Sequence, residues 1–294
     1  MYTFLLFLVS LIWGSTFFII KDTVTTVDES FIVFTRTGLA FFALLVYNLI
    51  RQPRKLFNPQ ALLYGIVLGI LLASIYLSQT IGLKYTSTGH SAFITGSAVV
   101  IVPFLLFSFY SQKIYKIDLI SVGIVLSGLF LLTYDLETSI NIGDIITLIT
   151  AISLAFHVVF AQQFVRKTDA GILVLYQFMG AMIVSGSVML FTNDGLPELT
   201  TQSTWSLIYL GLIGTLVCYF ITVWVQKYVA AIKVSIILAT EPIFAALCSY
   251  IFINETLNVN ELFGAGFILF GVFIHAWVKH RIKSKAKRFK LHNS

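Results

Sequence analysis

Two segments of the chain align with each other: YLSQTIGLKYTSTGH, Tyr76 to His90, and YFITVWVQKYVAAIK, Tyr219 to Lys233. A shift of 143 positions places Tyr76 on Tyr219, and Lys84-Tyr85 on Lys227-Tyr228. One ungapped register that matches charges, glycines and aromatic residues indicates an internal repeat. Further pairs in the same register are Gly123 with Gly266, Gly128 with Gly271, Asp118 with Glu261, and Trp13 with Phe156.

The composition is typical of a membrane protein. Hydrophobic residues make up 58% of the 294 residues and charged residues 11%, with a mean hydropathy of +0.92. This leaves too little polar material to cover a soluble globule. Ten apolar runs are each near the roughly 20 residues that a helix needs to cross about 30 Å of hydrocarbon. They lie at 3–20, 30–50, 61–83, 90–110, 117–134, 145–163, 171–191, 205–226, 234–253 and 262–278.

The repeat and the apolar runs together predict the fold class. Five runs fall in each copy, and an odd number of spans turns the second copy upside down relative to the first. We therefore expect an all-α integral membrane protein with ten transmembrane helices in two inverted five-helix repeats. The first repeat covers 1–137, the second covers 138–280, and a basic cytoplasmic tail covers 281–294. The first run lacks the basic start and the cleavage site of a signal peptide, so we interpret it as a retained helix.

Lysine and arginine predict the orientation. With the N-terminus in the cytoplasm, the 19 Lys and Arg residues lie in cytoplasmic loops and the tail, except Lys21 and Lys84 outside and Arg36 within a span. The positive-inside rule then predicts a multi-pass protein of the cell inner membrane with both termini cytoplasmic. Segments 135–144 and 193–203 are outer loops in this orientation.

Charge and motifs exclude several classes of function. The net charge of +6 comes mostly from the tail, which we interpret as facing lipid headgroups, so the expected partners include membrane lipids and no nucleic acid. Cys218 and Cys248 lie inside spans, where a structural disulfide is not expected. The sequence has no phosphate-binding glycine loop, paired metal ligands or HExxH segment. We therefore expect no enzyme activity, cofactor or metal, and energy from a substrate or ion gradient.

Three segments resemble a known family. They are Trp13-Gly14-Ser15, YTSTGHSAFITGSAVVIVP over Tyr85 to Pro103, and TEPIFAALCSYIFINETL over Thr240 to Leu257. Together with Gly264, Gly266 and Gly271 they look like the EamA family of the drug/metabolite transporter superfamily, over nearly the whole chain short of the tail. The first half departs from the pattern, since Gln112 stands at the repeat position of Glu255. We therefore treat Glu255 as a loop or helix-end residue.

The resemblance implies a bundle with a central cavity between the halves and transport by alternating access. Members of the superfamily often export amino acids, metabolites or drugs. Others import sugars or vitamins, or exchange nucleotide-sugars. The resemblance does not fix the substrate.

Glu241 is the leading candidate for contact with a substrate or a coupling ion. A carboxylate deep in a span is costly unless it is paired, hydrated or protonated. Pro242 follows it and removes a backbone donor, which exposes carbonyls one turn earlier. The alternative is a hydrogen-bonded glutamate that only stabilises a kinked helix.

Three more titratable residues are candidates, each with a structural alternative. Arg36 lies about six residues into its span, where it can line the cavity or snorkel to the headgroups. His157 and His90 are candidates for proton coupling. For His157, a hydrogen-bonded packing role is the favoured interpretation.

Helical spacing gathers a predicted cavity lining. Tyr76 and Gln79 lie three residues apart, and their repeat partners Tyr219 and Thr222 do the same. Polar atoms on one face of a span turn toward protein or water. The remaining candidates are Ser97 with its repeat partner Thr240, and Trp13 and Trp224, for which packing or an interface belt is the alternative.

The repeat partners of the charged candidates are not charged, since Glu241 pairs with Ala98, His157 with Gly14 and Arg36 with Met179. A substrate with two different ends requires such asymmetry. Gly65 and Gly69 form a GxxxG motif that favours close helix approach. The repeated glycines of the fifth and tenth spans favour packing between those helices, with a homodimer contact as the alternative.

The sequence predicts a secondary transporter of a small metabolite, an amino acid or a related compound, working in export by proton or substrate antiport. The alternatives are a multidrug or organic-cation exporter, and an importer or exchanger of a sugar, vitamin or nucleotide-type metabolite. A membrane-embedded enzyme and a scaffold or receptor are the candidates from other classes.

Overall fold

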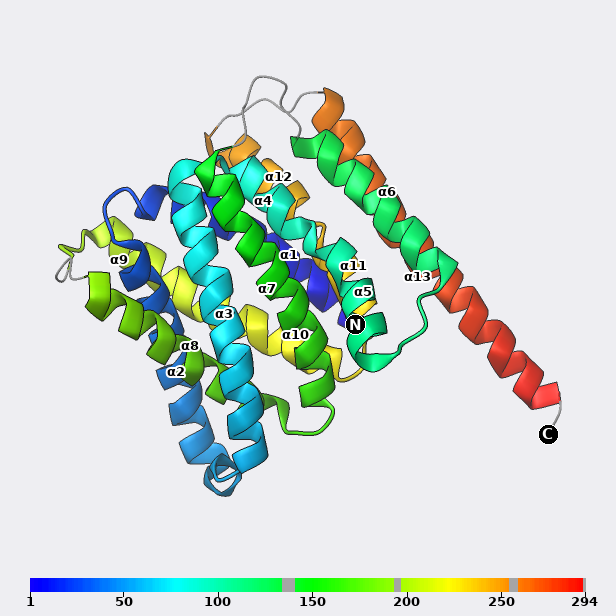
Figure 1. Ribbon diagram of the computed structural model, residues 1–294, viewed down its shortest axis with the longest axis horizontal. Helices are drawn as coiled ribbons and strands as arrows, with labels where there is room; N and C mark the ends of the chain where they lie inside the picture. Colours follow the sequence, from blue (N-terminus) through cyan, green and yellow to red (C-terminus); the bar gives the residue numbers. More distant parts are fainter. Residues whose placement is uncertain (134–140, 193–196, 254–258, 293–294) are drawn as a thin grey trace.

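The computed structural model describes residues 1–133, 141–192, 197–253 and 259–292, and the regular elements in these ranges are all helical (Figure 1). The acids Asp135, Glu137 and Glu255, and the side chains of the basic tail, lie outside the described residues. The helices are α1 (Tyr2–Thr23), α2 (Glu29–Arg51), η1 (Pro53–Leu56), α3 (Pro59–Tyr85), α4 (Thr88–Gly96), α5 (Ala98–Tyr110), α6 (Lys116–Thr133), α7 (Ile142–Val165), α8 (Ala170–Thr192), α9 (Thr201–Ile208), η2 (Tyr209–Val217), α10 (Cys218–Gln226), α11 (Ala231–Leu238), α12 (Glu241–Ile253) and α13 (Val259–His292).

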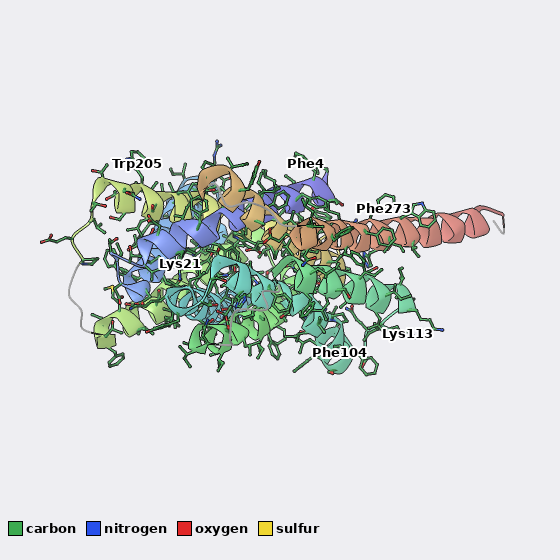
Figure 2. All side chains as sticks on the ribbon, turned by 90° about the horizontal axis from the view of Figure 1, so that it is seen from above. Phe4, Lys21, Phe104, Lys113, Trp205 and Phe273 are labelled. Carbon is green, nitrogen blue, oxygen red and sulfur yellow. The ribbon has the colours of Figure 1, made fainter. Side chains whose placement is uncertain are left out.

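The protein is an all-α membrane protein, as its sequence predicts. Within the described residues, nine helices or joined helices are long and apolar enough to cross a bilayer. The 18-residue helix α6 is the tenth. Large apolar side chains point outward from the bundle, as Phe104 and Phe273 do in Figure 2, where they are 55% and 65% exposed. Hydrocarbon is the environment in which such exposure carries no hydrophobic penalty.

Two spans are each made of two helical segments that meet in the middle. One break falls at Ser97, between α4 and α5, and the other at Ala239 and Thr240, between α11 and α12. Ser97 and Thr240 are partners in the repeat register. A helix break thus stands directly before Glu241 and Pro242, and its counterpart in the first half is not predicted from the sequence.

Corresponding helices of the two halves have corresponding neighbours: each helix packs against the equivalent helices of the other half. Helix α3 packs against α7 and α8, while its counterpart, the joined span α9–η2–α10, packs against α1 and α2. The broken span α4–α5 packs on α7, and the broken span α11–α12 packs on α1. This reciprocity is what two copies of one five-helix unit produce.

Glycines bring helices of opposite halves together. A Cβ on Gly69 of α3 would lie 2.8 Å from Cα of Gly180 in α8, so only glycine fits at this crossing. The GxxxG motif of α3 therefore packs as its sequence predicts.

Helices α6 and α13 form a pair on one flank of the molecule, and α13 continues past α6 (Figure 1). Gly128 and Gly264 bring their backbones together, whereas Gly123 and Gly266 have no atom within 4 Å of the Cβ position. Asp118 and His275 add a buried polar contact of 3.0 Å between the two helices. The predicted intramolecular packing thus holds for Gly128 and for Gly271, where a Cβ would lie 2.7 Å from Val125 of α6, but not for Gly123 and Gly266.

Polar contacts tie the helices at both ends of the bundle. At the end where α1 and α3 finish, Lys21 donates to the carbonyls of Leu83 and Thr86, and Lys84 forms a 2.7 Å ion pair with Glu29. The two Lys21 hydrogen bonds satisfy carbonyls that the end of α3 leaves without partners.

At the opposite end, Lys55 and Asp169 form a 3.0 Å ion pair. The Gln162 side chain accepts from the backbone N–H of Ala231, and Gln226 donates to the carbonyl of Val158.

Candidate functional site

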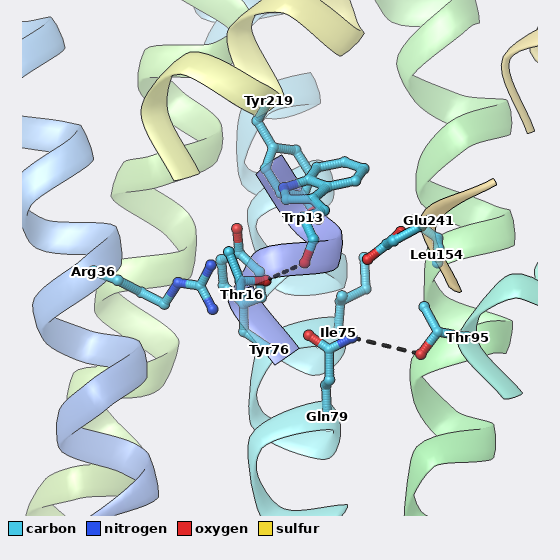
Figure 3. A pocket seen from close by; sticks show the side chains of 10 residues that line it. All are labelled: Trp13, Thr16, Arg36, Ile75, Tyr76, Gln79, Thr95, Leu154, Tyr219 and Glu241. Carbon is cyan, nitrogen blue, oxygen red and sulfur yellow. Dashed lines mark hydrogen bonds between the residues drawn. The ribbon is translucent and has the colours of Figure 1, made fainter. Parts of the chain in front are cut away.

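A small cavity lies between the halves, and its walls come from both of them (Figure 3). Its volume of about 20 Å³ is enough for roughly one water molecule, so a metabolite requires the helices to move apart. The lining residues are Trp13, Thr16, Arg36, Ile75, Tyr76, Gln79, Thr95, Leu154, Tyr219 and Glu241.

Arg36 of α2 lies inside the protein rather than at the headgroups. Its side chain is 1% exposed, and its guanidinium carbon lies 3.6 Å from the centre of the Tyr76 ring. Its Nε donates to Thr215 Oγ1 over 2.9 Å. The snorkelling interpretation is therefore wrong, because a cation–π contact and a hydrogen bond hold the guanidinium in the bundle. One of its two terminal guanidinium nitrogens, Nη1, is buried without a hydrogen-bond partner.

Thr215 lies in a π-helical stretch, η2, in the middle of its span. Its hydroxyl donates to the carbonyl of Leu210, five residues earlier, over 2.8 Å. Since a threonine hydroxyl has one proton, the Tyr76 hydroxyl, 3.1 Å away, is the donor to Thr215. Thr215 thereby orients both Arg36 and Tyr76. Wide helical turns of this kind are frequent at functional sites.

Three consecutive residues of α1 make three different contacts. Trp13 lines the cavity and donates from Nε1 to the carbonyl of Gly214 over 2.8 Å. Gly14 faces α12, where a Cβ would lie 2.7 Å from Cβ of Phe244. Ser15 lies 2.7 Å from the Tyr209 hydroxyl. The Trp-Gly-Ser motif thus joins α1 to η2 and α12 around the cavity.

Glu241 is the first residue of α12 and is 8% exposed. It also lines a second cavity, together with Thr95 and Leu154, which are shared by the two cavities. The second cavity continues along α5, α7 and α11, past Val102, Val158 and Ser235. Glu241 therefore lies on the boundary between two spaces that extend along different parts of the bundle.

Tyr219 and Gln79 complete the polar lining. Tyr219 packs against Trp13 with ring centres 5.0 Å apart, and edge-to-face against Tyr76 at 5.8 Å. Gln79 donates to Thr95 over 3.5 Å. Of the twelve predicted residues, the structure gathers six at one cavity: Trp13, Arg36, Tyr76, Gln79, Tyr219 and Glu241.

His157 is buried behind this cavity. Its Nε2 lies 3.0 Å from Gln177 Oε1, and its ring meets Tyr219 edge-on. This geometry matches the packing role. His157 supports the tyrosine without lining the cavity.

Five predicted residues lie elsewhere. His90 lies near the start of α4, 3.5 Å from Asp144, and Trp224 stacks edge-on against Tyr2 and Tyr228. The other three use their hydroxyls on their own backbone. Thr222 donates to Cys218, Ser97 to Ile94 and Thr240 to Ile237.

Four lining residues are not predicted by the sequence: Thr16, Ile75, Thr95 and Leu154. Helical spacing could have found Thr16, three residues after Trp13 on the same face. Thr95 lies two residues before the first-half break at Ser97, at a position whose repeat partner is Leu238.

Among the residues described, no group of three or more His, Cys, Asp or Glu side chains could hold a metal ion. The polar groups of the cavity are one guanidinium, one carboxylate, hydroxyls and an amide. These groups can form hydrogen bonds and ion pairs with a small polar molecule.

Comparison with known proteins agrees with this architecture. An uncharacterized transporter of Archaeoglobus fulgidus is 28% identical over 267 residues, which cover 91% of this chain and 83% of that protein. The uncharacterized inner membrane transporter YedA of Escherichia coli K12 is 26% identical over 293 residues, covering 95% and 92%. A crystal structure of a protein that is 11% identical shares the fold, with a TM-score of 0.79 and coverage of 95% and 98%.

The pattern of the EamA-like transporter family matches residues 1–134 and 141–277, so it covers nearly all of the chain in two parts. Because this match covers nearly the whole chain, the chain belongs to the EamA-like transporter family and is a membrane transporter.

Proposed function

We propose that this transporter moves a small metabolite, an amino acid or a related compound, out of the cell by alternating access. The main support is Glu241, which lines both cavities. A carboxylate on such a boundary can meet a substrate or a proton from either side. A charged group that is retained inside a span is by itself a functional candidate.

The two cavities suit access from opposite sides. Along α7, Leu154 lines both cavities and Val158, one turn later, lines only the second. Along the α4–α5 span, Thr95 lines both, while Val102 lines only the second. The second cavity thus runs toward the ends of α5 and α7. These ends are cytoplasmic in the proposed orientation, which rests on the lysine and arginine bias.

We further propose that 1–137 and 138–280 act as two inverted halves that rock against each other around Glu241. The reciprocal packing of the halves supports this. Proton antiport at Glu241 or exchange of substrates supplies the energy. A homodimer is a subsidiary proposal, for which Gly123 and Gly266 leave space on α6 and α13.

An organic-cation exporter is the second candidate. The rings of Trp13, Tyr76 and Tyr219 together with Glu241 are the chemistry that binds organic cations. Arg36 argues against it, because its own guanidinium already occupies a face of Tyr76.

Counterflow in proteoliposomes tests the function. Vesicles loaded with a mixture of unlabelled amino acids should take up labelled amino acid through the purified protein, whereas empty vesicles should not. Labelled tetraethylammonium serves as the probe for the cation exporter. Uptake of tetraethylammonium alone would replace the first candidate with the second, and chemical conversion of the label would indicate an enzyme.

A comparison of metabolites in cells with and without the protein identifies the compound and the direction. Accumulation of an amino acid inside cells that lack the protein is expected for an exporter. Depletion inside those cells would reverse the proposed direction.

A further inference from the structure

We propose that Arg36 binds the carboxylate of the transported molecule, and that Glu241 takes its positive end on the opposite wall. The cavity then selects zwitterionic compounds over amines and esters. This rests on the proposed function, because it names the substrate class of the same cavity. It assigns to Arg36 a role in binding, beyond its role in packing.

The first support is the orphan nitrogen of Arg36. The guanidinium is 1% exposed, Nε is engaged by Thr215, and Nη1 is buried without a hydrogen-bond partner. A charged N–H group that is buried without an acceptor is strongly destabilising. Arg36 nevertheless lies in the protein interior, where its side chain lines the cavity. An anionic ligand is the partner that removes it.

The second support is the absence of an internal counter-ion. Within the part of the chain that the structure describes, neither Arg36 nor Glu241 is in a salt bridge of 4.0 Å or less. Both nevertheless line one cavity. In a low-dielectric interior, opposite charges that serve only the fold are expected to pair with each other. Here they are held apart.

The third support is their placement. Figure 3 shows Arg36 entering from one side of the cavity and Glu241 from the other, with Thr16 and Tyr76 between them. A molecule with a carboxylate at one end and an ammonium at the other complements both walls. The rings of Trp13 and Tyr219 supply apolar surface for the rest of the molecule.

Arginine is suited to the carboxylate end. A guanidinium is planar and presents its N–H groups as a fork, which matches the two oxygens of a carboxylate. The ring of Tyr76 covers one face of the guanidinium and Thr215 fixes Nε. The group is therefore already oriented before a ligand binds, which reduces the entropy lost on binding.

Matched analogues test the proposal on the unmodified protein. The probes are L-leucine and L-phenylalanine, their methyl esters, their decarboxylated amines and their N-acetyl derivatives. Competition against labelled amino acid in counterflow should be at least about tenfold weaker for esters and amines than for the parent amino acids. N-acetyl derivatives, which keep the carboxylate and lose the ammonium, should also bind more weakly. Equal competition by esters and amines would overturn the proposal.

Variants separate binding from packing. Arg36→Gln should abolish the preference for the free carboxylate, and Arg36→Lys should keep part of it, since a lysine retains the charge without the fork. Arg51→Gln, at the exposed end of the same helix, is the matched control and should keep the full preference. If Arg36→Gln folds and keeps the preference, Arg36 has only a packing role.

The outcomes distinguish this proposal from the function on which it rests. Exchange of amines and esters as fast as amino acids would leave transport standing and reject the role of Arg36. No exchange of any compound in the panel by the unmodified protein would reject both. The analogue series requires no mutation, so a misfolded Arg36→Gln protein does not prevent the test.

Discussion

The two broken spans share a backbone and differ in chemistry. In α4–α5 the Ser97 hydroxyl donates to the carbonyl of Ile94 over 2.6 Å, and in α11–α12 the Thr240 hydroxyl donates to the carbonyl of Ile237 over 2.7 Å. Each hydroxyl satisfies the carbonyl three residues earlier, an arrangement that bends helices. The same hydroxyl-to-carbonyl hydrogen bond therefore occurs at both breaks.

The residues that follow the breaks are different. Ala98 and Val99 follow the first, whereas Glu241 and Pro242 follow the second. No proline stands directly after the first break, since Pro103 lies further along inside α5, so a proline next to the break is not needed to interrupt such a span. A proline in the first turn of a helix removes no intrahelical hydrogen bond. Both copies of the repeat therefore contain the helix break, whereas only the second copy has a carboxylate after it.

Replacing Glu241, the carboxylate that only the second break has, should have the largest effect on transport. Glu241→Gln keeps volume and hydrogen bonding but removes the charge, and concentrative transport should fall at least about tenfold, the factor that corresponds to roughly 1.4 kcal/mol. The measurement is initial uptake in proteoliposomes at matched protein content, over a series of pH values.

Two further variants control this result. Glu198→Gln removes an exposed carboxylate just before α9 and should transport normally. Ala98→Glu combined with Glu241→Ala moves the acid to the equivalent position of the first copy and should not restore transport. Full activity of that exchanged variant would mean that the two breaks are interchangeable.

The next largest effect, on stability, is expected where α1 packs against α12, next to the second break. A Cβ on Gly14 would lie 2.7 Å from Cβ of Phe244 and 2.8 Å from the backbone nitrogen of Ala245. Gly14→Ala should therefore reduce the free energy of unfolding by about 1–3 kcal/mol, because the clash includes backbone. Thermal unfolding in detergent measures it. Gly123→Ala, where nothing lies within 4 Å, should be neutral; an equal loss at both sites would indicate a general glycine effect.

The two hydroxyls should contribute equally. Ser97→Ala and Thr240→Val each remove one hydrogen bond, and each should lower the free energy of unfolding by about 0.5–1.5 kcal/mol. The control is Ser127→Ala, which removes an exposed hydroxyl that donates to Gly123 over 3.0 Å in α6. A loss several times larger at one break than at the other would show that the joints are not built alike.

The smallest effect is expected at the rim, far from both breaks. Burial raises the pKa of Asp169, but the ion pair with Lys55 and the backbone N–H groups of Ile172 and Gly171 outweigh it and lower the pKa below 3.8. A carboxyl with a lowered pKa stabilises the fold above its unfolded pKa, and this contribution is lost as the pH falls through the folded value.

Asp169→Asn should therefore lower the free energy of unfolding at neutral pH by less than about 1 kcal/mol, since the pair is partly exposed and screened. The difference from the unmodified protein should shrink below pH 4. A difference that is constant from pH 7 to pH 3 would contradict the role of the charge.

The sequence predicts the fold well because hydropathy and the repeat are properties of whole segments. Ten runs of the right length and one register suffice for the spans and for the reciprocal packing. Part of the predicted site follows from the same logic, since Tyr76 and Tyr219 are repeat partners and both line the cavity.

The rest depends on local geometry that no periodic pattern carries. Arg36 looks close to the membrane surface when residues are counted from the start of its span, yet it is buried because η2 presents Thr215 to it. Trp224 has the same residue type as Trp13 but lies in an aromatic cluster with Tyr2 and Tyr228. Residue type alone cannot distinguish these positions.

The π-helical stretch η2 has an evolutionary consequence. Its turns hold more residues than α-helical turns, so deleting one residue from Tyr209–Val217 could leave a regular helix with the same ends. The deletion would rotate Thr215 away from Arg36 and change which side chains face the cavity, while the loops keep their lengths. Insertions and deletions within a span, which usually disrupt membrane helices, are at this point a route by which descendants of this chain could acquire a different cargo.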